Sequence, residues 1–277
     1  MTLPRDDIIS RLQSSAAENE DAMDIAGVAL LLAQLDDPEE STQPYQEHLG
    51  ELARDMAGAA KGVGHVRDMA AGLSDVLFRF HGYSGDTETY DDIQNANLMR
   101  VIDRRKGLPV AMGILVIHLA RSQGWSITGL NFPGHFLLRL THEGEQAIID
   151  PFRKAKRLTA DNLLGMVTQM QGPHAKLHPH YLSSVSDREI LLRLQNNIKT
   201  RALEAEDTDH ALEILETMTL ISPDSAAVIS ELALLESETG NFKQALDRLT
   251  VFLERRLGHP DESQVMALIK NLKRRLH

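Results

Sequence analysis

The sequence predicts an α+β protein, and three observations support this fold class. Apolar residues recur every three to four positions from Asp6 to about Gly82, which indicates several helices. A nearly all-apolar helix and three strand-like segments occupy the middle of the chain. Helical spacing returns beyond Arg157 and continues to the end. We therefore expect a helical N-terminal region, a central buried helix with an antiparallel sheet, and an all-helical C-terminal domain.

The composition is that of an ordinary soluble globular protein and excludes several classes of function. Of the 277 residues, 42% are hydrophobic and 25% are charged, and the formal net charge is -11. This charge disfavours nucleic acids and anionic membranes as partners, because both carry phosphate groups. The chain has no cysteine, so thiol catalysis, disulfides and cysteine-ligated metals are excluded.

The sequence gives no sign of a secretory signal or a membrane span. Met1–Ser10 carries three charged residues and lacks an apolar core. The longest apolar run, Leu108–Ile117, is shorter than the ~20 residues that a membrane-spanning helix needs. We expect a cytoplasmic protein.

Two helices are predicted in the middle of the chain. The first is expected over Asp91–Lys106, ending at Gly107, with basic residues in its last turn that complement the helix dipole. The second is expected over Pro109–Gln123, since proline suits the first position of a helix. Its residues are apolar on nearly every side, which is typical of a buried helix.

An antiparallel meander is expected after the central helix. The turn His142–Glu145 joins its last two strands, and pairing of Thr141 with Gln146 makes His135 and Asp150 diagonal neighbours on one face. A slip of one residue would put these two side chains on opposite faces. The three expected strands are Ser126–Asn131, His135–Thr141 and Gln146–Phe152.

The C-terminal helices carry an internal repeat. The segments Asp207–Pro223 and Asn241–Pro260 match at a fixed offset, and Ala211 and Ala245 lie 34 residues apart. This is the period of tetratricopeptide repeats, in which a small residue lets two antiparallel helices approach closely. Two copies are few for a free-standing array, so we expect them to pack on the preceding domain.

Three motifs resemble one known family. NANLMRVIDRRKGLPVAMGI, NFPGHFLLRL and AIIDPF follow one another in the order found in the SirB-one family. That family combines a transglutaminase-like domain with tetratricopeptide repeats, and the resemblance extends from about Gly27 to the C-terminus. It implies a transglutaminase-like domain over residues 1–158 and a helical repeat domain over residues 159–277. The chain departs from the family at Arg153–Lys156, where small glycine-rich residues are usual.

The resemblance also implies a catalytic centre without its nucleophile. In the wider superfamily a cysteine begins the central helix, and a histidine and an aspartate follow on the next strands; these positions correspond to Pro109, His135 and Asp150. Proline has neither a thiol nor a backbone N–H to stabilise an oxyanion. We expect these three positions to be vestigial, with no catalytic residue, no cofactor and no metal.

Other interpretations of individual residues stay open. Ser84, Ser126 or Thr128 could act as a relocated nucleophile with His135 and Asp150, although none begins the central helix. The His135–Asp150 pair could instead be a hydrogen-bonded structural pair or line a ligand pocket. His174, His178 and His180 form a loose histidine group that is more typical of an exposed loop than of a zinc site.

The leading functional expectation is a non-catalytic regulatory or adaptor protein. Helical repeats offer extended surfaces for a partner's peptide or helix, so we expect a protein partner at the repeat domain. The resemblance implies a bacterial cytoplasmic protein, and enzymatic activity is not expected. The alternatives are a hydrolase or acyl transferase with a relocated nucleophile, and a small-ligand sensor at the vestigial cleft.

Overall fold

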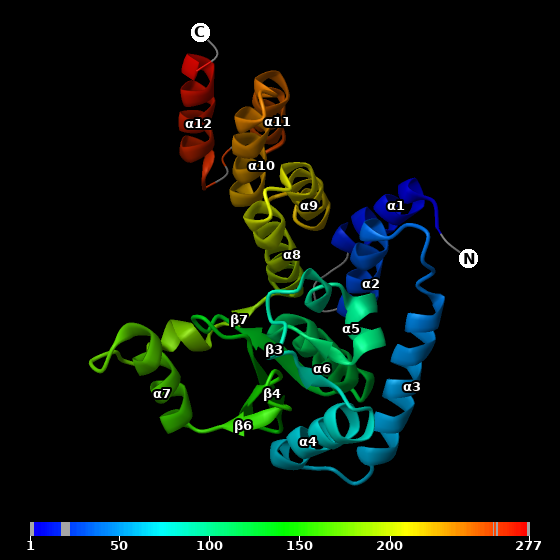
Figure 1. The fold of residues 1–277 in the computed structure, drawn as a ribbon. Coiled ribbons are helices and arrows are strands. Elements are labelled where there is room, and N and C mark those ends of the chain that lie inside the picture. Colours follow the sequence, from blue (N-terminus) through cyan, green and yellow to red (C-terminus); the bar gives the residue numbers. More distant parts are fainter. Residues whose placement is uncertain (1–2, 18–22, 257, 259, 276–277) are drawn as a thin grey trace.

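The computed structural model describes residues 3–17, 23–256, 258 and 260–275. The first two residues of Met1–Ser10, and positions 257 and 259 of the repeat segment Asn241–Pro260, therefore lie outside the described residues. No helix in these ranges is long and apolar enough to cross a membrane. Helices dominate the fold (Figure 1). The α-helices are α1 Arg5–Ala17, α2 Ile25–Asp36, α3 Gln43–Ala59, α4 Val66–Leu73, α5 Leu98–Arg104, α6 Pro109–Ser122, α7 Ala160–Gln171, α8 Asp187–Glu204, α9 Thr208–Ile221, α10 Ala226–Glu238, α11 Phe242–Arg255 and α12 Glu262–Arg275.

The sheet contains the antiparallel meander that the sequence predicts, with two strands, β6 and β7, added. Five strands pair in the order β6-β5-β4-β3-β7, and Thr141 faces Gln146, so the expected register is confirmed. Glu143 and Gly144 adopt positive φ at the hairpin turn, as a tight two-residue connection requires. The strands are β3 Ser126–Leu130, β4 Leu137–His142, β5 Glu145–Asp150, β6 Lys156–Leu158 and β7 Ser184–Val185, and a separate parallel pair is β1 Ser84–Gly85 with β2 Lys106–Gly107.

Helix α6 is the buried centre of the first domain. All its residues from Val110 to Ile117 are buried, and the helix packs against α2, α3, α8 and the strand β3. One continuous apolar core extends from α1 and α2 through α6 and one face of the sheet to α8, α9 and α10. The expected arrangement of a central apolar helix beside the meander is confirmed.

The sheet layer continues past residue 158, where the boundary between the two domains was expected. Helix α7 buries Leu163, Met166 and Val167 against Leu130 and Leu137 of the sheet in a separate apolar cluster. Strand β7 then pairs with β3 at the edge of the same sheet. The helical repeats follow from α8 onward (Figure 1).

The repeats form two antiparallel helix pairs, α8 with α9 and α10 with α11, followed by α12. Ala211 and Ala245, the two residues that share the 34-residue spacing, are both fully buried, as close helix contacts require. The expected packing on the preceding domain is also present. Helix α1 lies against α9, with Ile8 and Leu12 almost inaccessible to solvent (Figure 1).

The helix expected over Asp91–Lys106 is shorter than the sequence suggested. A turn of 3-10 helix covers Ile93–Asn95, and α5 begins only at Leu98, because the Asn97 side chain accepts a hydrogen bond from the Arg100 backbone N–H and caps a new helix. The helix ends at Arg104, and Arg105 is in the left-handed conformation with φ 55. The stop is therefore not at Gly107, which lies in β2.

Candidate functional site

Pro109 is the first residue of α6, as expected. Leu108 precedes it in extended conformation, and the Leu108 N–H donates to the backbone oxygen of Asn95 at 2.9 Å. Proline leaves no hydrogen bond unmade here, since the first N–H groups of a helix have no partner within the helix. The first position of α6 therefore carries a half-buried ring with no nucleophilic group and no N–H.

His135 lies in the turn before β4, and the packing of its neighbour sets its position. Phe136 is buried against Gly113, one helical turn along α6 from Pro109; a Cβ atom on Gly113 would lie 2.2 Å from the phenyl ring. Only glycine leaves room for this ring, so the segment that carries His135 is held against α6. The His135 side chain itself is half-buried.

Asp150 is the last residue of β5 and is 4% exposed. Its Oδ1 accepts hydrogen bonds from the backbone N–H groups of Phe152 at 3.0 Å and Arg153 at 3.2 Å. Its Oδ2 lies 3.8 Å from Nε of Arg153. The carboxylate thus holds the turn that follows β5. Among the described contacts, no hydrogen bond joins it to His135, so the expected hydrogen-bonded pair is not formed.

The two side chains are nonetheless coupled electrostatically. Burial lowers the pKa of the His135 imidazole below its ordinary value, and the nearby guanidinium groups of Arg153 and Arg193 lower it further. The Asp150 carboxylate acts in the opposite direction without outweighing them. The net effect favours the neutral form of the His135 imidazole.

Arg193 is the residue of this site that sequence reasoning missed. It lies on α8, donates a hydrogen bond to the backbone oxygen of His135 at 3.1 Å, and places its Cζ 5.4 Å from the centroid of the Phe136 ring. Its position in the sequence resembles any basic residue on a helix. Nothing local marks it, because the contact joins the repeat helices to the turn before β4.

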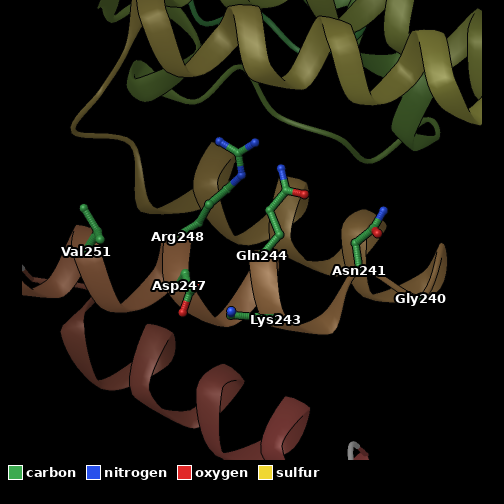
Figure 2. Close-up of a pocket in the computed structure, with 7 residues that line it drawn as sticks. All are labelled: Gly240, Asn241, Lys243, Gln244, Asp247, Arg248 and Val251. Atoms are coloured by element: carbon green, nitrogen blue, oxygen red, sulfur yellow. The ribbon is translucent and has the colours of Figure 1, made fainter.

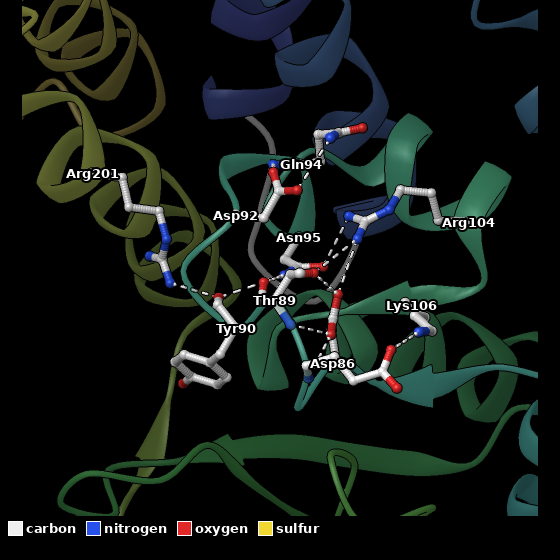
Figure 3. A network of polar contacts seen from close by, with 10 residues as sticks. Asp86, Thr89, Tyr90, Asp92, Gln94, Asn95, Arg104, Lys106 and Arg201 are labelled. Atoms are coloured by element: carbon white, nitrogen blue, oxygen red, sulfur yellow. Dashed lines mark hydrogen bonds and ion pairs between the residues drawn. The ribbon is translucent and has the colours of Figure 1, made fainter. Parts of the chain in front are cut away.

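The segment before α6 is held by a buried polar network (Figure 3). Asp86 is 1% exposed and binds Arg104 at 3.0 Å, and Arg104 also donates to Asn95 Oδ1 at 3.1 Å. Burial disfavours the charged form of Asp86, but hydrogen bonds from Thr89 and the Glu88 backbone outweigh it and hold the pKa of the carboxyl well below its usual range. Arg104 is thus the centre of a structural network as well as a residue of the last turn of α5.

The alternative nucleophiles lie apart from His135 and Asp150. Ser126 and Thr128 line a hollow of about 450 Å³, whose lining includes neither His135 nor Asp150. Ser84 forms the short parallel pair with Lys106. The arrangement gives no support to a hydroxyl relocated beside His135.

The histidine group near residue 178 contains no metal centre among the described residues. The rings of His178 and His180 stack with centroids 5.6 Å apart, and His180 packs edge-on against Tyr181 at 4.3 Å. The side chains lie in an exposed segment around a turn of 3-10 helix over Pro179–Leu182.

A second candidate site is a groove on the repeats. A hollow of about 600 Å³ runs along α11, and its lining includes Lys243, Gln244, Arg248 and Val251 (Figure 2). Hollows of about 420 and about 240 Å³ between α1 and the repeats share Arg248 with it. We call this continuous surface, which extends from Gly240 along α11 to Arg256, the α11 groove.

The family of the chain follows from comparison with known proteins. The family described as Transglutaminase-like superfamily matches residues 43–196. The chain belongs to this superfamily. A tetratricopeptide repeat family matches residues 198–271, which confirms the repeat architecture.

Bacterial relatives cover most of the chain. A UPF0162 protein of Vibrio cholerae is 32% identical over 86% of this chain and 88% of its own length. Protein SirB1 of Salmonella typhimurium is 22% identical over 83% of this chain and 86% of its own, so the resemblance to the SirB-one family is confirmed. Among solved structures, a crystal structure of menin matches with a TM-score of 0.43 and 8% identity, covering 90% of this chain and 69% of menin.

Proposed function

We propose that this member of the transglutaminase-like superfamily is a non-catalytic regulatory or adaptor protein, which binds a helical segment of a partner protein in the α11 groove. The proposal includes a bacterial cytoplasmic setting, for which the bacterial relatives give support. Two features of the chain support the two halves of the proposal: the residue that begins α6 and the shape of the repeat surface.

The absence of catalysis is supported by Pro109. Attack on an acyl group needs a nucleophile next to a base and an oxyanion donor. The chain has no cysteine, and Pro109 supplies neither a nucleophile nor an N–H at the start of α6. His135 and Asp150 are still present, but the carboxylate binds backbone N–H groups and does not orient the imidazole.

Protein binding is supported by one observation above all: a helix of the chain itself already packs beside the groove. Helix α1 lies along α9, and its Gln13 and Ala16 line the hollow that continues to Val251 on α11. The remaining length along α11 is open, and Val251 is 42% exposed there. A second amphipathic helix placed end to end with α1 would cover this apolar side chain.

The charge of the groove indicates the chemistry of that helix. Lys243, Arg248, Arg255 and Arg256 contribute positive groups to its lining, against Asp247 and, in the smallest hollow, Glu213 and Glu216. Arg248 already pairs with Glu236 and Glu216, and Arg256 with Asp224, whereas Lys243 and Arg255 are exposed and have no ion pair among the described residues. We therefore expect a partner helix with apolar residues on one face and acidic residues beside them.

Affinity purification of the tagged full chain from its bacterial host, followed by cross-linking at Lys243, tests the proposal. Val251→Asp should reduce the captured partner at least tenfold. The matched control is Leu203→Asp, because Leu203 is 40% exposed on α8 and lies outside the linings of the hollows described above. Equal capture by both variants, or cross-links that avoid α11, would contradict the proposal.

A further inference from the structure

We propose that one side of α12 pairs with the same side of a second copy of this chain, so that two molecules form an antiparallel dimer. This surface is separate from the α11 groove, whose hollows are lined by no residue of α12. The dimer therefore stands or falls independently of the proposed function. It is supported by the place of α12 in the fold, by its exposed apolar side chains and by the order of its charges.

Helix α12 is the outermost described helix of the repeat array (Figure 1). It packs against α11 and α10, and it buries Val265 and Leu272 completely in an apolar cluster that is separate from the main core. The outermost face of a repeat array is usually polar, which keeps the array soluble. A second side of α12, next to the buried one, does not follow this rule.

This second side carries apolar groups that the described chain leaves uncovered. Met266 is 50% exposed, and Ile269 is only half-buried although it packs against the apolar cluster. The two residues line an open hollow of about 630 Å³ along the helix, together with Lys270, Lys273 and Arg274. The methylene stems of these basic residues add to the apolar surface. Exposed apolar side chains with a polar rim are typical of an interaction surface.

Four residues form a continuous stripe along this side of the helix. Glu262, Met266, Ile269 and Lys273 follow one another at intervals of four, three and four residues. This spacing keeps side chains on one face of an α-helix, and it is the spacing of the seam where two helices meet in a coiled coil. The stripe is acidic at its N-terminal end, apolar in the middle and basic at its C-terminal end. We call these four residues the α12 stripe.

The order of these groups favours an antiparallel second copy. When two α12 stripes pair about their midpoint, Glu262 of each copy lies opposite Lys273 of the other, and Met266 lies opposite Ile269. Apolar residues then meet in the centre, and opposite charges meet at both ends. A parallel pair would place like charges against each other, which is unfavourable. An interface in which the same patch serves both copies closes after two subunits.

The charged ends of the α12 stripe are available for this pairing. Lys273 is exposed and has no ion pair among the described residues. Arg275 is engaged elsewhere, because its Cζ lies 5.6 Å from the centroid of the Phe242 ring on α11. Glu262 Oε2 accepts the backbone N–H of Gly258 at 3.0 Å, which holds the carboxylate at this end of the helix. A carboxylate accepts several hydrogen bonds, so this contact leaves room for a lysine.

Analytical ultracentrifugation of the full chain over a concentration series tests the proposal. The α12 stripe is short, so the interface is small and the dimer should be weak and reversible. Met266→Asp should raise the dissociation constant of the dimer at least tenfold, because it places a charge in the apolar centre. The matched control is Asn271→Asp, which adds the same charge to an exposed position of α12 outside the hollow and should change little.

Charge reversal distinguishes a second copy from any other occupant. Glu262→Lys and Lys273→Glu should each weaken self-association, because like charges then meet at both ends of the α12 stripe. A mixture of the two variants restores opposite charges at both ends, so a mixed dimer should form at least tenfold more tightly than either variant associates alone. Circular dichroism checks that each variant keeps its helix content.

If Glu262→Lys does not fold, the comparison of Met266→Asp with Asn271→Asp decides the question. Three results overturn the proposal: a wild type that stays monomeric at submillimolar concentration, equal dissociation constants for these two variants, or no gain in association when two folded charge variants are mixed.

Discussion

The guanidinium of Arg193 donates a hydrogen bond to the backbone oxygen of His135 at 3.1 Å. This contact joins α8, the first helix of the repeat array, to the turn before β4. The repeat helices and the sheet are therefore parts of one packed structure, and changes on one side have consequences on the other.

The titration of His135 should make the protein less stable at acid pH. Its folded pKa is lowered by burial and by Arg153 and Arg193, so below pH 6.5 the unfolded chain binds the proton first and the free energy of unfolding falls. His135→Gln should make this fall shallower in chemical denaturation between pH 7 and 5. It should not abolish the fall, because burial and Arg105 also lower the pKa of His48. An unchanged slope would contradict the assignment.

Pro109→Cys should install an accessible thiol at the start of α6. The fold should persist, since the first helical position tolerates most residues. The free energy of unfolding should fall by about 0.4–1 kcal/mol, because the unfolded chain without this proline has more conformational freedom. The helix N-terminus should lower the thiol pKa below its usual ~8.5. Alkylation rates measured against pH should therefore have a lower midpoint than those of the control Ser126→Cys, which lies on β3. Coincident midpoints would show that the start of α6 does not activate a thiol.

The Asp86 network should be a major source of stability. Asp86→Asn removes the almost fully buried negative charge that pairs with Arg104. Breaking such a pair costs about 3–5 kcal/mol. Because the folded pKa of Asp86 is depressed, its contribution is present above the unfolded value of about 4 and is lost as the pH falls. Urea denaturation of the wild type and the variant should converge in acid.

The control for this network is the neighbouring exposed pair. Lys106 binds Glu88 at 2.8 Å, but both side chains are largely exposed. Glu88→Gln should therefore leave the free energy of unfolding almost unchanged. A similar loss for both variants would mean that burial of Asp86 does not matter.

Gly113→Ala should destabilise the protein despite the better helix propensity of alanine. The new Cβ would meet the Phe136 ring at 2.2 Å, and overpacking of this kind costs about 1–3 kcal/mol. Gly58→Ala on α3 meets nothing within 4 Å and should instead stabilise by up to about 1 kcal/mol. Thermal unfolding of the two variants separates the effect of core packing from that of helix propensity. Higher thermal stability in both variants would disprove the close contact at Gly113.

Local patterns in the sequence were sufficient for much of the fold. The turn His142–Glu145 determines the pairing of Thr141 with Gln146, because a two-residue connection leaves one register. Pro109 and the apolar residues after it predict α6 to within one residue. The spacing of Ala211 and Ala245 predicts the repeats.

Contacts between distant segments were not visible in the same way. The end of α5 depends on Asn97 and on the left-handed Arg105, whose guanidinium is held by Tyr83 and His48. Strand β7 joins the sheet through β3, which lies more than fifty residues earlier. Arg193 likewise meets His135 only in the folded chain. Such positions depend on tertiary packing, which overrides the local preferences that a sequence displays.

The contact of α1 with α9 has a consequence for synthesis. Helix α1 leaves the ribosome long before α9, which begins at Thr208. At about 5–20 residues per second, the face of α1 that packs on α9 waits roughly 10–40 s for its partner, with only α2 beside it. During that interval the nascent chain exposes an apolar strip that a chaperone can bind, and α1 docks on α9 only after the sheet between them in the sequence has been synthesised.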